Sequence, residues 1–120
     1  MDSLPTAWSE EVFEKVARIE PETLVKWIDA GEIPPASLIF AAEILGKWCT
    51  LHIAMPKLLE LSHHRSSLVR EGAVHGMKYH LGIHASFYGE ISRLREMAEN
   101  DVSSGVRQAA KEALEEFDKI

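Results

Sequence analysis

The stretch Ser66–Leu81, SSLVREGAVHGMKYHL, decides the fold, because it returns 37 positions later as SSGVRQAAKEALEEFD in Ser103–Asp118. In both copies a valine–arginine pair comes first, and small residues follow at three- and four-residue spacing. The matched positions are Val69, Arg70, Gly72, Ala73 and Gly76 in the first copy and Val106, Arg107, Ala109, Ala110 and Ala113 in the second. Two helices of one design, separated by one helical hairpin, predict a repeat architecture.

The two glycines of the first copy need a physical reason. Glycine inside a helix costs about 1 kcal/mol relative to alanine. Gly72 and Gly76 lie on one helical face together with Ala73, and small residues there let a second helix approach closely. We therefore expect tight helix packing at this face, with a functional opening for a ligand as the alternative.

The same residues resemble the second helix of a HEAT-like repeat, an α-solenoid family. The preceding helices should carry leucines, as Leu58–Leu61 and Leu94–Ala98 do. The resemblance implies an aspartate in the turn within each repeat, whose carboxylate meets the arginine of the next helix. Asp101 matches that position, whereas His64 stands there in the earlier copy, a departure from the family pattern. The resemblance also implies that the second helices line a concave surface that holds a partner.

We expect a single all-α domain over 1–120, a right-handed stack of about seven helices that form roughly three HEAT-like hairpins. Residues 57–120 carry the two clearest repeats, 21–56 a degenerate repeat, and 1–20 an N-terminal helix. No alternating β-branched run predicts a strand.

Helix boundaries follow from caps and prolines. Ser9 should cap the first helix, Pro21 should open the second and Pro35 the third. The third helix, over 36–50, is apolar nearly all round and should be buried, with Trp48 in the core. Pro56 should start the fourth helix. Ser66 or Ser67 should cap the fifth helix, which Gly82 ends. The sixth covers about 86–99, and the seventh starts at 103.

Composition excludes several functional classes. The net charge of −6 argues against a nucleic-acid binder, which needs a basic surface. The longest apolar stretch, Ala36–Leu45, is interrupted and too short to span a bilayer, and the N-terminus does not read as a signal peptide. The single cysteine, Cys49, fits a reducing compartment, so we expect a cytoplasmic protein without a membrane partner.

Catalytic and metal-binding motifs are not found in the sequence. His80 and His84 are four residues apart, but Gly82 lies between them and should break the helix, so we expect no metal. Cys49 lies on the apolar third helix, where a buried and inert thiol is expected. No nucleophile elbow, phosphate-binding loop or dinucleotide motif is present. The sequence therefore predicts a protein that is not an enzyme and needs no cofactor.

Binding is the better prediction. If Val69, Ala73 and Gly76 face the core, the remaining side chains of the fifth helix project outward and combine an aromatic ring, cations and an imidazole. The predicted partner-binding set is Arg70, Val74, His75, Lys78 and Tyr79. The alternative is that these are ordinary surface residues, with Arg70 in a structural pair.

The predicted function is a non-catalytic protein–protein interaction module or adaptor. A second hypothesis is a small acidic inhibitor or immunity-type protein that masks a basic enzyme, its net charge accelerating association. A third is a metal- or nucleic-acid-associated HEAT-like protein.

Overall fold

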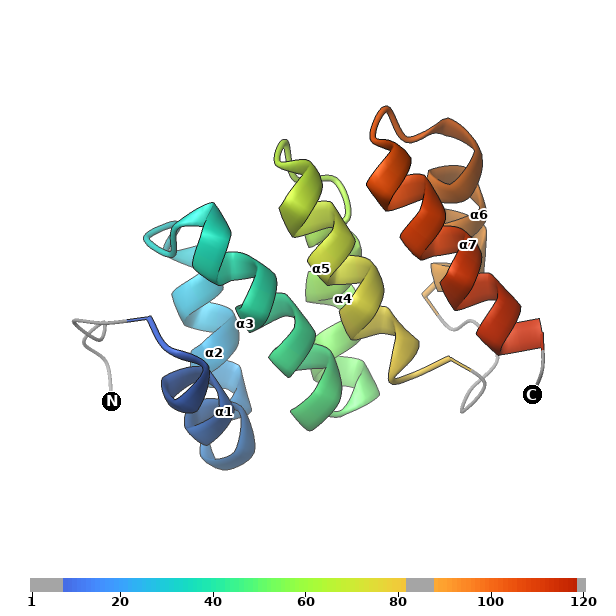
Figure 1. Cartoon of the computed structure of the whole chain (residues 1–120). Coiled ribbons are helices and arrows are strands. Elements are labelled where there is room, and N and C mark those ends of the chain that lie inside the picture. The colour runs from blue at the N-terminus through green and yellow to red at the C-terminus, as the bar shows by residue number, and fades with distance from the viewer. Residues whose placement is uncertain (1–7, 82–87, 119–120) are drawn as a thin grey trace.

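The computed structural model describes residues 8–81 and 88–118, which form seven α-helices and no strand (Figure 1). The prediction of an all-α chain is therefore confirmed over these residues. The helices are α1 (Glu10–Ile19), α2 (Pro21–Asp29), α3 (Pro35–Trp48), α4 (Leu51–Leu61), α5 (Ser67–Lys78), α6 (Glu90–Asn100) and α7 (Ser104–Asp118).

The helices form two layers. In Figure 1, α3, α5 and α7 lie side by side in one layer, which we call the front layer, and α2, α4 and α6 lie behind it. Helix α1 packs against α2 and α3 at the N-terminal end. The molecule measures 40 × 28 × 19 Å, so it is elongated along the direction in which the helices succeed one another.

Local sequence signals set most helix starts as predicted. The Ser9 hydroxyl accepts a hydrogen bond of 3.2 Å from the Val12 amide, and two glutamates follow in the first turn of α1. Pro21 and Pro35 each occupy the first turn of their helix, where the missing amide proton has no intrahelical partner to lose. After α2, Gly31 adopts a φ of 75°, which glycine accommodates without strain and which turns the chain toward α3.

The predicted start of the fourth helix is wrong. Helix α4 begins at Leu51, and Pro56 lies inside it. The proline removes one helical hydrogen bond, but Leu51, Ala54 and Met55 are all buried, and this apolar burial favours helix before the proline as well as after it.

The ends of the fifth and sixth helices also differ from prediction. Helix α5 ends at Lys78, earlier than expected. Helix α6 begins at Glu90, after Gly89 with a φ of 75°, later than the predicted start near residue 86. The predicted breaker Gly82, and with it His84 and residues 86–87, lies outside the described residues.

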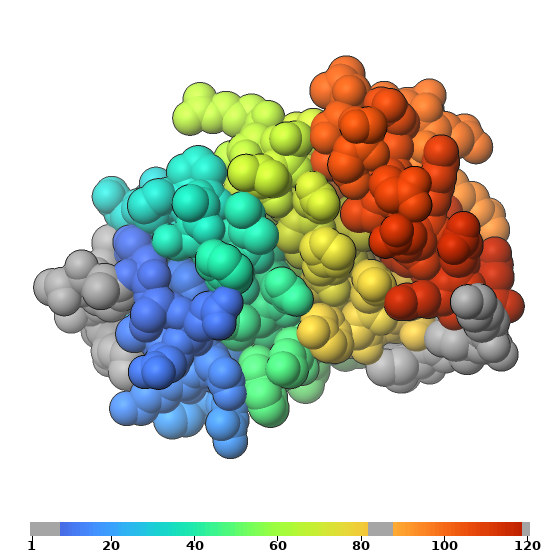
Figure 2. All heavy atoms as spheres, in the orientation of Figure 1, coloured from blue at the N-terminus to red at the C-terminus, as the bar shows by residue number. Residues whose placement is uncertain are grey.

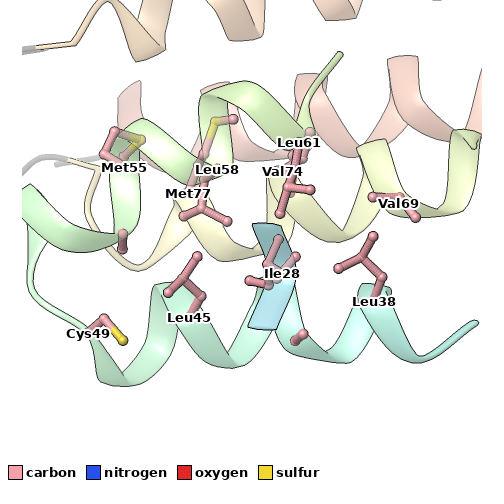
Figure 3. Close-up of a cluster of buried hydrophobic side chains, with 14 of the residues drawn as sticks. Ile28, Leu38, Leu45, Cys49, Met55, Leu58, Leu61, Val69, Val74 and Met77 are labelled. Carbon is pink, nitrogen blue, oxygen red and sulfur yellow. The ribbon is translucent and has the colours of Figure 1, made fainter. Parts of the chain in front are cut away.

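One hydrophobic core runs between the layers. Figure 3 shows Leu38 and Leu45 of α3 facing Val69 and Met77 of α5, with side chains of α4 beside them. Val74 belongs to this core and is fully buried, so the prediction that it projects outward is wrong. Helix α5 is covered by α3, α4 and α7, which leaves it a narrower exposed face than the sequence predicts.

Glycines bring α3 and α5 close together. A Cβ atom on Gly76 would lie 2.6 Å from the Ala42 carbonyl oxygen, and one on Gly72 would lie 3.0 Å from the Ile39 carbonyl oxygen. A Cβ atom on Gly46 would overlap the backbone of Gly76. The glycines of the opening stretch therefore serve tight helix packing, the first of the two readings given above.

The two copies of the repeat share a hydrogen-bond pattern in their turns. The His64 carbonyl accepts from Arg70 Nη1 at 2.9 Å, and the Asp101 carbonyl accepts from Arg107 Nη1 at 2.6 Å. In the same turns, His64 Nδ1 accepts from the Ser66 amide at 3.0 Å, as Asp101 Oδ1 does from the Ser103 amide at 2.9 Å. His64 thus replaces the turn aspartate in this backbone contact.

A partly buried ion pair joins the two copies. Asp101 binds Arg70 through two hydrogen bonds, Nε to Oδ2 at 2.9 Å and Nη2 to Oδ1 at 3.0 Å. The side chains are only 12% and 7% exposed. The expected contact between this carboxylate and the next helix's arginine is therefore wrong, because the carboxylate reaches back to α5. The equivalent ion pair one repeat earlier would join His64 of the turn to an arginine of α3. Because His64 carries no carboxylate and α3 contains no arginine, both partners of that pair are missing.

Candidate protein-binding groove

Two adjoining hollows lie on the front layer, and we call them together the front groove. Their volumes are about 260 and 150 Å³, and Glu43 and Tyr79 line both, so the two hollows lie next to each other. The face formed by α1, α3, α5 and α7 is seen in Figure 2. The lining residues are Glu10, Glu14, Phe40, Glu43, Ile44, Lys47, Trp48, His75, Lys78, Tyr79 and Glu116.

Helix α3 supplies the apolar side of the groove through a second stripe of large side chains. Phe40, Ile44 and Trp48 recur every four residues, so they share one face of the helix. The core stripe, which includes Leu38 and Leu45, is buried. Phe40 and Trp48 remain 44% and 39% exposed, so the prediction that this helix is buried all round, with Trp48 in the core, is wrong.

Helix α5 contributes three of the five predicted partner-binding residues. His75, Lys78 and Tyr79 line the front groove, and Tyr79, at the C-cap of α5, is 43% exposed. The other two do not join them: Val74 is buried in the core, and Arg70 is held by Asp101 at the turn. Of the two readings of Arg70, the structural pair is therefore the one realised.

Sequence reasoning missed the contribution of α3. Phe40, Glu43 and Trp48 were not among the predicted site residues, although one signal was available. Glu43 and Lys47 interrupt the apolar run on the side of Phe40 and Ile44. Charged residues at that side indicate a face that meets water rather than a neighbouring helix.

Some of the charged residues that line the groove have a partner close by. Lys78 Nζ lies 3.3 Å from Glu116 Oε1, which links α5 to α7. Arg18 lies 3.6 Å from Glu14, and its guanidinium carbon lies 4.9 Å from the centre of the Trp48 ring. The Lys47 ammonium lies 5.5 Å from the same ring. These contacts show that an aromatic ring of the groove already holds cations against its face.

Glu10 and Glu43 have no such partner, because among the described residues no side-chain hydrogen bond or ion pair engages either carboxylate. Glu10 is exposed, whereas Glu43 is partly buried. The lining residues comprise four glutamates and two lysines, so the groove carries an excess of negative charge.

The titratable groups with shifted pKa values lie away from the groove. Burial raises the pKa of the Cys49 thiol to about 11, and its Sγ faces the Ala17 carbonyl oxygen at 3.9 Å in the core. Lys57 is buried between α2 and α4, where it contacts Asp29 and lies 2.6 Å from Glu60. Burial alone lowers the pKa of Lys57, but these two carboxylates outweigh it and raise the pKa. Burial and local ion pairs in the packed core therefore account for the pKa shifts of both groups.

Two further hollows do not combine exposed aromatic and charged side chains from several helices. The larger, about 530 Å³, has a described lining drawn from α1 alone. The other, about 320 Å³, surrounds the Arg70–Asp101 pair at the turns. No group of three or more metal-ligating side chains occurs within residues 8–81 and 88–118. The front groove is thus the place where several helices bring exposed aromatic and charged groups together.

Comparison of the chain with protein-family models, with curated proteins and with solved structures finds no match. In the part of the chain that the structure describes, every helix falls short of the length and apolar character needed to cross a bilayer.

Proposed function

We propose that the chain is a short HEAT-like α-solenoid that works as a non-catalytic protein–protein interaction module. In this proposal α2–α3, α4–α5 and α6–α7 are three hairpins of a right-handed stack, and α1 precedes them. Consecutive helices alternate between the two layers, and the two later turns share a hydrogen-bond pattern 37 positions apart, which supports this arrangement. The partner binds in the front groove.

One observation carries the functional proposal: Phe40, Trp48 and Tyr79 are all exposed along the same groove. Aromatic side chains in a hollow combine a large contact area with few rotatable bonds, and tryptophan and tyrosine are enriched at the energetic centres of interfaces. Two adjoining hollows lined by several helices offer room for an extended or helical segment of a partner.

Capture of a partner from native lysate, quantified by mass spectrometry, tests the proposal. The test variant is Trp48→Ala with Tyr79→Ala, which removes two rings from the groove. The matched control is Leu68→Ala with Val102→Ala, because these exposed apolar residues lie outside the groove. We expect the groove variant to lose the partners that the wild type and the control retain, while circular dichroism shows that it stays folded at the temperature of the assay. Equal capture by all three proteins would overturn the proposal.

A masking protein for a basic enzyme remains the second candidate, since the groove and the whole chain are acidic. Steered association weakens steeply with salt because screening acts on the association rate. A captured partner whose association rate is independent of salt would exclude this second function and leave the first.

A further inference from the structure

We propose that the front groove recognises a basic segment of a partner protein, with one lysine or arginine side chain of that segment bound at Glu43. The carboxylate pairs with the cationic head, and Tyr79 and Phe40 contact the aliphatic stem. This inference rests on the proposed function and specifies the chemistry of the partner.

The position of Glu43 is the first argument. It lies near the middle of α3 and, with Tyr79, lines both hollows of the groove, so any segment that occupies the groove passes it. Glu43 is partly buried, and its carboxylate has no cationic partner among the described residues. A carboxylate that a ligand further desolvates is destabilised unless a cation accompanies the ligand.

The charge balance of the groove is the second argument, because Glu10 and Glu43 have no paired cation among the described residues. Lys78 is paired with Glu116, and Lys47 lies against the Trp48 ring, where Arg18 also lies. The glutamates that line the groove outnumber its lysines by two, four against two. An acidic segment would therefore meet net repulsion, whereas a basic segment would be attracted.

Aromatic rings beside the carboxylate are the third argument. Tyr79 and Phe40 are exposed at the groove, and such rings favour the long apolar stem and the cationic head of lysine and arginine. The Arg18–Trp48 contact demonstrates the same interaction within the molecule at 4.9 Å. A neutral aliphatic side chain would gain the stem contact alone.

The test uses three short synthetic peptides of one leucine–alanine–serine background that differ at a single central residue: arginine, norleucine or glutamate. Binding to the full chain is measured by titration of backbone amide signals in NMR spectra. We expect the arginine peptide to shift signals of α3 and α5 and to bind about fivefold more tightly than the norleucine peptide, as one partly exposed ion pair with a ring contact provides. The glutamate peptide should bind most weakly.

Two variants locate the preference. Glu43→Gln keeps the size of the side chain and should abolish the advantage of arginine over norleucine. Glu99→Gln makes the same change of net charge at an exposed position on α6 in the rear layer, so it should leave the advantage intact. A preference that survives in Glu43→Gln, or falls equally in both variants, would overturn the inference.

The outcomes also separate this inference from the function on which it depends. Binding of all three peptides in the groove with equal affinity would refute the basic-segment inference and leave a protein-binding groove. The absence of shifts at the groove with every peptide would refute the inference, while the capture experiment with the Trp48 and Tyr79 variant decides the function independently.

Discussion

Gly76→Ala tests the central packing contact of the fold. The added Cβ would lie 2.6 Å from the Ala42 carbonyl oxygen and 2.7 Å from Leu58 Cδ2, whereas ordinary contact begins near 3.4 Å. Helix α5 must therefore move away from α3 by about 0.8 Å, and a gap of that size forfeits roughly a quarter to a half of each dispersion contact across it.

The expected change in the free energy of unfolding combines two opposing effects. Overpacking of this kind costs about 1–3 kcal/mol, and the upper part of that range applies because one clashing atom belongs to the backbone. Replacing a helical glycine by alanine returns about 1 kcal/mol. We therefore expect Gly76→Ala to lower the free energy of unfolding by about 1–2 kcal/mol and to lower Tm by roughly 4–10 °C. Urea and thermal unfolding, both followed by circular dichroism, measure these two quantities.

Gly105→Ala is the matched control for this prediction. Its new Cβ would lie 3.2 Å from the end of the Glu71 side chain, which can move aside. We therefore expect this variant to be as stable as the wild type or more stable by up to about 1 kcal/mol, the gain from alanine in a helix. A Gly76→Ala protein as stable as the wild type, or more stable, would refute the close approach of α3 and α5 and with it the explanation of the opening stretch.

Three further predictions follow from the turns and the core. Asp101→Ala should cost about 1–3 kcal/mol because it leaves the Arg70 side chain, only 12% exposed, without its carboxylate, and adding Arg70→Met should recover part of that loss in a double-mutant cycle of urea unfolding. Burial and the charges of Arg65 and Arg70 lower the pKa of His64 below its ordinary value of 6.5, so its contribution to stability is complete above about that pH and is lost on acidification below it. His64→Asn should therefore reduce the fall of Tm between neutral and mildly acidic pH. A fall of Tm as large as that of the wild type would contradict the role of neutral His64 in the turn. Cys49, with its pKa raised to about 11 by burial, should react with a thiol reagent only when the chain unfolds, so rapid labelling of the native protein would argue against a buried thiol.

Asp101 also loses a stabilising contribution in acid. Burial by itself raises the pKa of Asp101, but hydrogen bonds from Arg70 and the Ser103 amide outweigh it and keep the pKa below its ordinary value of 3.8. Its contribution is complete above that value and disappears as the pH falls through the lower pKa of the folded state. The pH range in which Asp101 loses its contribution lies well below the range in which His64 does. One acid titration of Tm therefore distinguishes the two groups.

Much of the fold could be predicted because local signals decide it. The cap at Ser9, the prolines that open α2 and α3, and the small residues at Gly72 and Gly76 act through their own helix or its nearest neighbour. Pro56 misled the prediction because its local preference for a helix start is weaker than the burial of apolar residues that precede it.

The site was harder to predict because it depends on which face of a helix another helix covers. Phe40 and Leu38 are both apolar residues of α3, and the helices that pack against α3 bury Leu38 but leave Phe40 exposed. The prediction for Val74 was wrong for the same reason. Helices α3, α4 and α7 all pack against α5, so Val74 is buried although it lies outside the small-residue face. The partner of Asp101 lies 31 residues away in the preceding copy, so its identity requires the arrangement of the two copies in space.

Hydroxyl-radical footprinting of the chain, free and bound to a captured partner, tests the central claim most directly, because it reports the exposure of individual side chains. We predict that Phe40, Trp48 and Tyr79, all exposed in the free chain, lose most of their reactivity in the complex. Leu68 and Val102, exposed outside the front groove, should react equally in both states. Protection of Leu68 and Val102 with unchanged reactivity of the three aromatic residues would contradict the assignment of the front groove as the binding site.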